Sequence, residues 1–149
     1  MTNNFEIKKL NSNEIAFAKE IVKMFGFDDE NYVLPPANYV AEMLSRNDYH
    51  VVIALENQQL IGGLTAYEMK MFKRETTEMF LYEIEVKESL RQRGVAKALI
   101  EFLKQICVEK GIVEMFVGAQ KDNQAARKLY STTGGKADED SVWSNYLFN

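Results

Sequence analysis

The stretch YEIEVKESLRQRGVAKALIEFL, residues 82–103, decides the fold, because a strand-like run ends there in a cluster of charges and a helix begins directly after it. The helix has an apolar face that can pack against a sheet, made of Val95, Leu99, Phe102, Leu103 and Ile106. Its first turn carries no large apolar side chain and consists of Arg91, Gln92, Arg93 and Gly94.

This first turn is suited to an anion. The first N–H groups of a helix have no internal partner and carry the positive end of the helix dipole, so an anion can bind to backbone donors alone. Gly94 lets the chain turn without a Cβ atom, and the small Ala96 keeps the next position open. Arg91 and Arg93 add positive charge. The sequence predicts a phosphate-binding turn fed by a strand, with ordinary turn chemistry as the alternative, since neither a glycine-rich dinucleotide motif nor a P-loop occurs.

Hydrophobic periodicity on both sides of this turn predicts an α+β (α/β) fold in the order βααβββαβαβ. Its sheet is mixed and mostly antiparallel in the N-terminal half. The first helix is introduced by capping-type Asn and Ser residues at positions 11–13, and the later long helix ends at Gly111. The predicted strands are 4–10, 51–55, 60–67, 77–86, 112–119 and 141–149, and the predicted helices are 11–27, 37–46, 94–110 and 123–133.

Composition narrows the class of protein. The 149 residues are 46% hydrophobic and 27% charged, which predicts a single domain spanning 1–149. The net charge of −4 and the pI of about 5.1 argue against nucleic acid as a partner. No apolar run approaches the roughly 20 residues of a membrane span, and the first residues lack the features of a secretory signal. We therefore expect a cytoplasmic protein without a membrane partner.

Two candidate reactive residues are better explained by packing. The chain has one histidine, His50, and one cysteine, Cys107, which cannot form the ligand set of a zinc site, so no metal is expected. We interpret His50 as a strand or core residue. Cys107 lies several turns beyond the phosphate end of its helix, too far away for a covalent role.

Two motifs give the chain a family resemblance. LRQRGVAKAL matches the Arg/Gln-x-x-Gly-x-Gly/Ala signature of the GNAT superfamily of acetyl-CoA-dependent N-acetyltransferases, with Arg91, Gly94 and Ala96 at the defining positions. DNQAARKLYSTTGG resembles a second segment of that family through Asn123, Ala126, Leu129, Tyr130 and Gly134. The predicted element order fits the GNAT fold over nearly the whole chain.

The resemblance implies how acetyl-CoA, or coenzyme A as its product, would bind. The backbone of Ile84, Glu85 and Val86 would pair with the pantetheine arm, where this strand splays from the strand at 112–119. Asn123 and Ala126 belong to the second cofactor segment, and Tyr130 would place its hydroxyl near the thioester sulfur. The pyrophosphate would be held by the N–H groups of Gln92, Arg93, Gly94, Val95, Ala96 and Lys97.

Acetyl transfer to an amine requires a proton acceptor, because an aliphatic ammonium has a pKa of about 10.4. Simple alternation along 77–86 places Glu83 on the same face as the apolar Met79 and Leu81, where a carboxylate is unusual. We therefore predict Glu83 as the general base and Tyr130 as the general acid. Glu85 is the second choice for the base, and a surface ion pair of Glu83 with a Lys or Arg is the alternative.

The acceptor amine is predicted from a narrower resemblance. Residues 60–86 are similar to the corresponding segment of the aminoglycoside 3-N-acetyltransferases, in which an aspartate follows the tyrosine that Tyr82 matches; here Glu83 follows it. The resemblance implies antibiotic resistance as the role. Two acidic groups would attract a polycation if they border one cleft, although such runs are usually solvated loops. These groups are Asp28, Asp29 and Glu30, and Asp138, Glu139 and Asp140.

Other readings stay open. Many GNAT proteins acetylate other small amines, or an amino terminus or lysine of a protein, and a GNAT fold can also serve as a non-catalytic acetyl-CoA-binding module. The sequence is silent on the oligomeric state, and a homodimer is expected only because many relatives of the family pair.

Overall fold

The structure is a computed structural model that describes residues 4–26 and 30–148. The chain divides into two compact units, residues 1–118 and 119–149. Within the described residues no helix is both long and apolar enough to cross a membrane.

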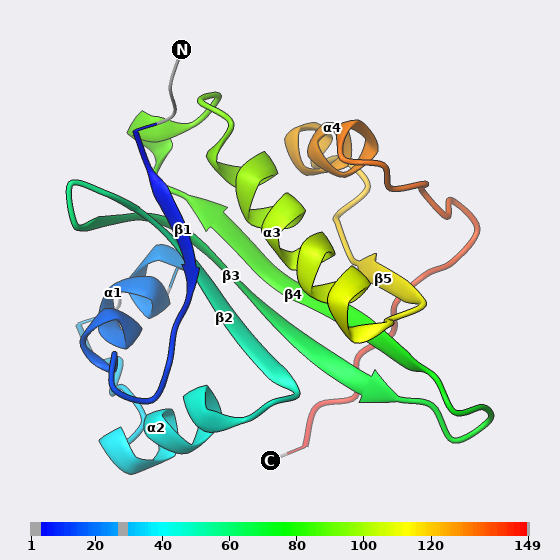
Figure 1. Cartoon of the computed structure of the whole chain (residues 1–149). Coiled ribbons are helices and arrows are strands. Elements are labelled where there is room, and N and C mark those ends of the chain that lie inside the picture. Colours follow the sequence, from blue (N-terminus) through cyan, green and yellow to red (C-terminus); the bar gives the residue numbers. More distant parts are fainter. Residues whose placement is uncertain (1–3, 27–29, 149) are drawn as a thin grey trace. The chain divides into compact units, whose positions relative to one another are not determined.

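The first unit is built on a five-stranded sheet whose strand order, β1-β2-β3-β4-β5, follows the chain (Figure 1). β1 to β4 pair antiparallel, and β5 is parallel to β4, which confirms the predicted mixed sheet. The strands are β1 (Glu6–Lys9), β2 (Tyr49–Glu56), β3 (Gln59–Lys70), β4 (Thr77–Val86) and β5 (Glu114–Val117). The helices are α1 (Ala16–Met24), α2 (Ala37–Ser45) and α3 (Val95–Lys110), with a short 3-10 helix, η1 (Glu88–Leu90).

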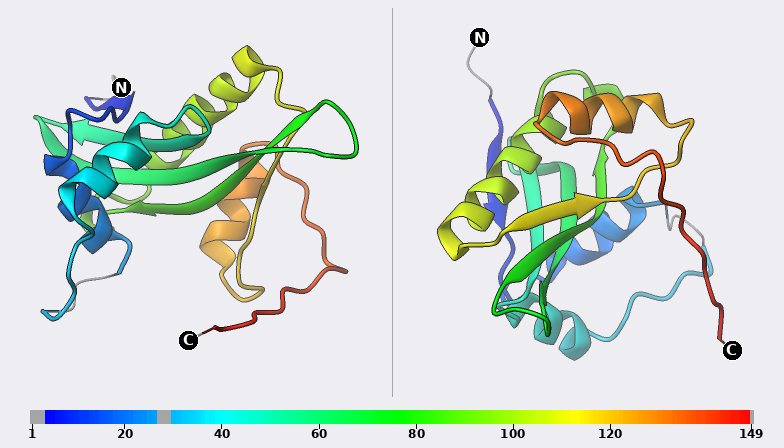
Figure 2. Two further views of the ribbon diagram at one scale, coloured as in Figure 1. Left: turned by 90° about the horizontal axis from the view of Figure 1, so that it is seen from below. Right: turned by 90° about the vertical axis from the view of Figure 1, so that its right-hand side faces the viewer.

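Helices α1 and α3 cover opposite faces of this sheet (Figure 2). Two neighbouring glycines of β3 show why, because successive residues of a strand point to opposite faces. A Cβ on Gly63 would lie 2.5 Å from Cδ1 of Ile21 in α1, whereas a Cβ on Gly62 would lie 3.2 Å from Cγ1 of Val95 in α3. Helix α2 shares the face of α1, since its Leu44 belongs to the same buried cluster as Ile21.

A β-bulge in β4 changes which side chains share a face. Glu83 pairs with Thr65, but Leu81 pairs with the next residue of β3, Ala66, so Tyr82 is one extra residue in β4. Up to Leu81 the buried side chains of β4 point to the α3 face, and beyond the bulge the phase is reversed. The prediction that Glu83 shares a face with Met79 and Leu81 is therefore wrong, because alternation holds only while both strands advance together.

The start of α1 also differs from the prediction. Its N-cap is Ile15, which offers no side-chain cap. The capping-type residues act one turn earlier: Asn11 accepts a hydrogen bond from the N–H of Asn13 at 2.9 Å, and Glu14 accepts one from the N–H of Asn11 at 3.1 Å. Asn11 therefore shapes a turn that precedes the helix.

The second unit contains α4 (Gln124–Thr132). Its N-cap is Asn123, whose side-chain oxygen accepts a hydrogen bond from the N–H of Ala126 at 3.1 Å. The predicted strand over 141–149 is wrong for the described residues 141–148, which form no strand and are exposed. Alternating apolar residues form a strand only where their backbone groups find a partner strand, and a local pattern cannot supply one.

Candidate active site

The turn between β4 and α3 has the geometry of an anion cradle. Gln92 and Gly94 both lie in the left-handed region, with φ of 62° and 83°. The first bond inside the helix runs from the N–H of Ala98 to the carbonyl of Gly94 at 2.9 Å, so the N–H groups of Val95 to Lys97 point out of the helix end. Apart from its chain neighbours, no atom of the described residues lies within 4 Å of a Cβ built on Gly94. The predicted phosphate turn is thus open and rich in backbone donors.

The two arginines of this turn are tied to nearby carboxylates. Arg91 donates to Oε1 of Glu85 at 2.7 Å and to the carbonyl of Val86 at 3.2 Å. Arg93 makes a two-pronged ion pair with Glu56, at 2.6 and 3.2 Å. Their guanidinium groups fix the turn against β4 and against the end of β2.

Beyond the bulge, β4 has an open backbone edge within the first unit. Its pairing with β5 covers only four residues, from Glu78 to Leu81. The N–H of Lys87 donates to β3, at the carbonyl of Ile61, so by alternation the backbone groups of Val86 and Ile84 face away from β3. This is the splay that the family resemblance implies for the pantetheine arm.

Glu83 lies on the α1 face of the sheet. Its Oε2 accepts a hydrogen bond from the hydroxyl of Thr65 at 2.9 Å. Both side chains line a cavity of about 210 Å³ that extends beneath α1. The apolar wall of this cavity is formed by Ile21, Val22, Phe25 and Val51, and its remaining lining residues are Tyr32 and Tyr49. No ion pair of Glu83 with a Lys or Arg is found among the described residues, so the surface-pair alternative has no support in this part of the chain.

Tyr49, which lines the cavity, is the first of three tyrosines in ring contact. The rings of Tyr49 and Tyr67 lie 4.8 Å apart, and the exposed Tyr82 at the bulge contacts Tyr67 edge-on at 5.9 Å. Burial raises the pKa of Tyr49 well above its usual value, and the nearby Tyr67 and Glu83 raise it further. Burial likewise raises the pKa of Tyr67. The hydroxyl groups of Tyr49 and Tyr67 are therefore protonated donors at neutral pH.

Sequence reasoning missed Thr65 and Tyr49. Thr65 lies in the predicted strand 60–67 and is 5% exposed although its neighbours in β3 are apolar or glycine, whereas Tyr49 opens β2 two residues before the predicted strand 51–55. A polar residue within an otherwise buried strand was the available signal.

The residues predicted from the second motif lie in the second unit. Asn123 caps α4 and Ala126 donates to it, so this pair has a structural role within that unit. Burial raises the pKa of Tyr130, which keeps its hydroxyl protonated at neutral pH. The distance of Tyr130 from Glu83, and its role as the acid, stay predictions.

The acidic groups fall in different parts of the chain. Asp28 and Asp29 lie outside the described residues, and Glu30 is exposed. In the second unit Glu139 pairs with Arg127, and Asp138 accepts a hydrogen bond from the hydroxyl of Ser141 at 2.7 Å, while Asp140 is exposed. Local partners thus occupy part of the second group, and a shared cleft for both groups stays a prediction.

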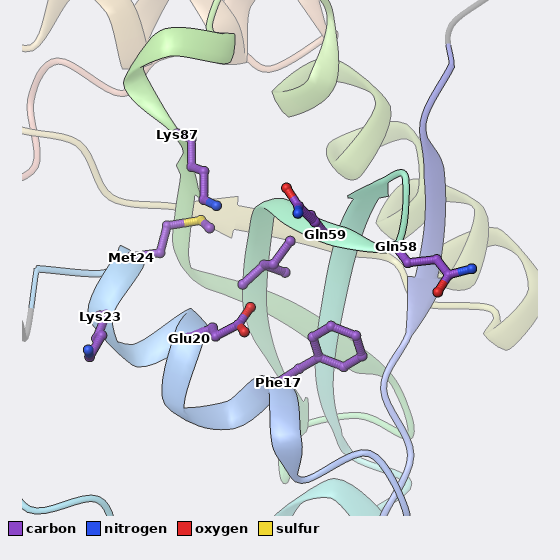
Figure 3. Close-up of a pocket in the computed structure, with 8 residues that line it drawn as sticks. Phe17, Glu20, Lys23, Met24, Gln58, Gln59 and Lys87 are labelled. Atoms are coloured by element: carbon purple, nitrogen blue, oxygen red, sulfur yellow. The ribbon is translucent and has the colours of Figure 1, made fainter.

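A second cavity lies on the other side of α1 (Figure 3). It has a volume of about 490 Å³ and is bounded by α1, the β2–β3 turn and Lys87. Lys87 and Glu20 point into it from opposite sides, across Met24. No motif of the sequence indicated this cavity.

His50 is a core residue, as predicted. It is 2% exposed, and its Nε2 donates to Glu68 at 2.5 Å, while Lys110 donates to the same oxygen at 2.5 Å. Burial lowers the pKa of His50, which is therefore neutral at pH 7, and its buried Nδ1 has no partner among the described residues. Cys107 is also buried. No group of three metal-ligating side chains occurs within the described residues.

Comparison with known proteins identifies a family and several similar structures. Residues 16–134 match the model of the acetyltransferase (GNAT) family. An aminoglycoside acetyltransferase from an uncultured soil metagenomic sample, solved with sisomicin, is 27% identical over 99% of this chain and 98% of its own, with a TM-score of 0.90. A second such enzyme from an uncultured soil sample is 31% identical over 100% of both chains, with a TM-score of 0.89.

A more distant structure shares the fold. The aminoglycoside N-acetyltransferase AAC(6')-Iy, solved with CoA, is 22% identical over 98% of this chain and 97% of its own, with a TM-score of 0.78. No curated protein sequence matches the chain.

Proposed function

The chain belongs to the GNAT acetyltransferase family and is an acetyl-CoA-dependent N-acetyltransferase, and on that premise we propose that its acceptor is an aminoglycoside or a similar polycationic amine. The observation that carries the proposal is the position of Glu83. Its carboxylate lies in a cavity on the α1 face, on the strand that also has the open edge. Structures of aminoglycoside acetyltransferases that align over at least 98% of both chains support this acceptor class.

The first unit has room and donors for the cofactor. The outward N–H groups of Val95 to Lys97, together with those of Gln92 to Gly94, would hold the pyrophosphate, since a Cβ built on Gly94 meets no other described residue within 4 Å apart from its chain neighbours. The open edge at Ile84 and Val86 would pair with the pantetheine arm once Arg91 releases the Val86 carbonyl. When bound, acetyl-CoA supplies an acyl carbon that is open to attack by a neutral amine.

Two side chains of the protein would accept and donate the protons of the reaction. Oε1 of Glu83, which the Thr65 hydroxyl leaves unoccupied, would take a proton from the ammonium nitrogen of the acceptor. The protonated hydroxyl of Tyr130 would hold the proton for the leaving sulfur. This assignment requires residues 1–118 and 119–149 to act together as one acetyltransferase domain.

The site of acetylation is a finer part of the proposal. The resemblance around Tyr82 and Glu83 points to the 3-amine, and the 6'-amine named in one structural neighbour is the alternative outcome. A homodimer, a cytoplasmic location and a role in antibiotic resistance also stay predictions, as does recognition of the polycation by Asp28, Asp29 and Glu30 and by Asp138, Glu139 and Asp140.

The test is thiol release from acetyl-CoA across aminoglycosides, polyamines, amino acids and short peptides. Turnover with aminoglycosides, with the acetylated nitrogen located by NMR of the product, would support the proposal. Turnover with peptides or simple amines alone would overturn the acceptor class. Glu83→Gln should lose activity at neutral pH, where the acceptor amine is an ammonium ion, and full turnover by this variant across pH would remove the base assignment.

A further inference from the structure

Thr65 is the cross-strand partner of the proposed base. It is 5% exposed, and its hydroxyl lies 2.9 Å from Oε2 of Glu83. The extra residue at Tyr82 produces this pairing: without the bulge, Tyr82 would face Thr65, and Glu83 would face Leu64 on the α3 side. The bulge and the threonine together place the carboxylate in the cavity beneath α1.

The hydroxyl of Thr65 is held in a fixed direction. Its β-branched side chain has few rotamers on a strand. Tyr49 of β2 lines the same cavity as Thr65 and Glu83, and its ring lies 4.8 Å from that of Tyr67. Tyr49 and Tyr67 face each other in the strand register. Side chains from β2, β3 and β4 therefore meet at this cavity, and the Thr65 hydroxyl is the one that bonds the carboxylate.

We propose that Thr65 is a positioning residue for acetyl transfer, which holds Oε2 of Glu83 so that Oε1 faces the acceptor amine. The inference rests on the proposed role of Glu83. A carboxylate with one oxygen fixed keeps its rotamer, and the free oxygen then receives the proton from the ammonium nitrogen.

The test compares Thr65→Val with Thr65→Ser. Valine fills nearly the same volume without a donor, whereas serine keeps the hydroxyl. We expect Thr65→Val to lower kcat about 10-fold with a smaller change in KM for the amine, because the base loses its orientation. Thr65→Ser should restore most of the lost kcat.

A second measurement does not depend on turnover. The carboxyl 13C signal of Glu83, assigned with Glu83→Gln, should shift at pH 7 in Thr65→Val and return in Thr65→Ser. Tyr49→Phe provides another variant, with a smaller shift in the same direction, because it leaves the Thr65 hydroxyl in place. An unchanged signal and an unchanged kcat in Thr65→Val would overturn the positioning role. If Glu83→Gln is fully active while the signal still shifts, the proposed base fails but the hydrogen bond to Thr65 stands.

Discussion

Helix α3 begins and ends on a glycine in the left-handed region, and this symmetry gives a controlled test of the phosphate cradle. Gly94 has φ 83° at the start and Gly111 has φ 67° at the end. In the part of the chain that the structure describes, a Cβ built on either glycine meets no atom within 4 Å other than those of its chain neighbours. Gly94→Ala and Gly111→Ala therefore impose the same kind of backbone strain, but only Gly94 lies at the proposed cofactor site.

The two variants should be equally destabilised without ligand. A left-handed residue with a Cβ costs about 1–2 kcal/mol. For a chain of this size each kcal/mol lowers Tm by about 2–4 °C. We therefore expect both Gly94→Ala and Gly111→Ala to unfold about 2–8 °C below the wild type, with neither disturbing the core.

Coenzyme A should stabilise the two variants to different extents. At 100 times its Kd a ligand stabilises the native state by about 2.7 kcal/mol. The new methyl group of Gly94→Ala projects into the space in front of the helix end, so we expect its Kd to rise at least tenfold. At the same coenzyme A concentration its gain then falls to about 1.4 kcal/mol or less. Gly111→Ala should keep the full gain. Thermal unfolding of the wild type and the two variants, with and without coenzyme A, measures these gains in stability. An equal gain in all three proteins would refute the cradle.

Three further predictions concern packing, pH and the thiol. Gly63→Ala should lower the free energy of unfolding by about 1–2 kcal/mol, because its Cβ would lie 2.5 Å from Cδ1 of Ile21. Ile21→Val removes that Cδ1 atom. The double variant should be less destabilised in urea unfolding than the two single costs combined, and strictly additive costs would contradict this close approach. Burial lowers the folded-state pKa of His50, so the unfolded chain binds its proton first, and stability should fall as the pH drops below about 6.5. His50→Gln should lose less between pH 7.5 and 5.5, and an equal loss would exclude His50 as the cause. Burial raises the pKa of the Cys107 thiol, so a disulfide dye should react with it only after unfolding, whereas fast reaction of the native protein would contradict its burial.

Residues 77–86 show what can and what cannot be predicted from the sequence. The predicted strand has the same bounds as β4, because its apolar and β-branched residues are bounded by clear breaks. The face of Glu83 was predicted wrongly, because a bulge is a property of two paired strands and leaves no mark in one of them. Glu83 was therefore proposed as the base because of the strand face predicted for it, and in the structure it lies on the opposite face.

The phosphate turn could be predicted from the sequence because its geometry is local. Gly94, Gly111 and the apolar face of α3 depend on neighbours within a few residues. The hydrogen bond between Thr65 and Glu83 joins residues 18 positions apart through the register of β3 and β4, which no local pattern specifies.

The coincidence of strand order with chain order has a consequence for folding. β2, β3 and β4 are joined by short turns, so their antiparallel pairing requires only small loops to close, and this meander should form early. The parallel pairing of β5 with β4 must wait until residues 87–113, which include α3, have crossed back over the sheet. That last seam is only four residues long. We expect hydrogen exchange to be fastest along this seam, so that the edge proposed to receive the pantetheine arm adjoins the pairing that is last to form and first to open.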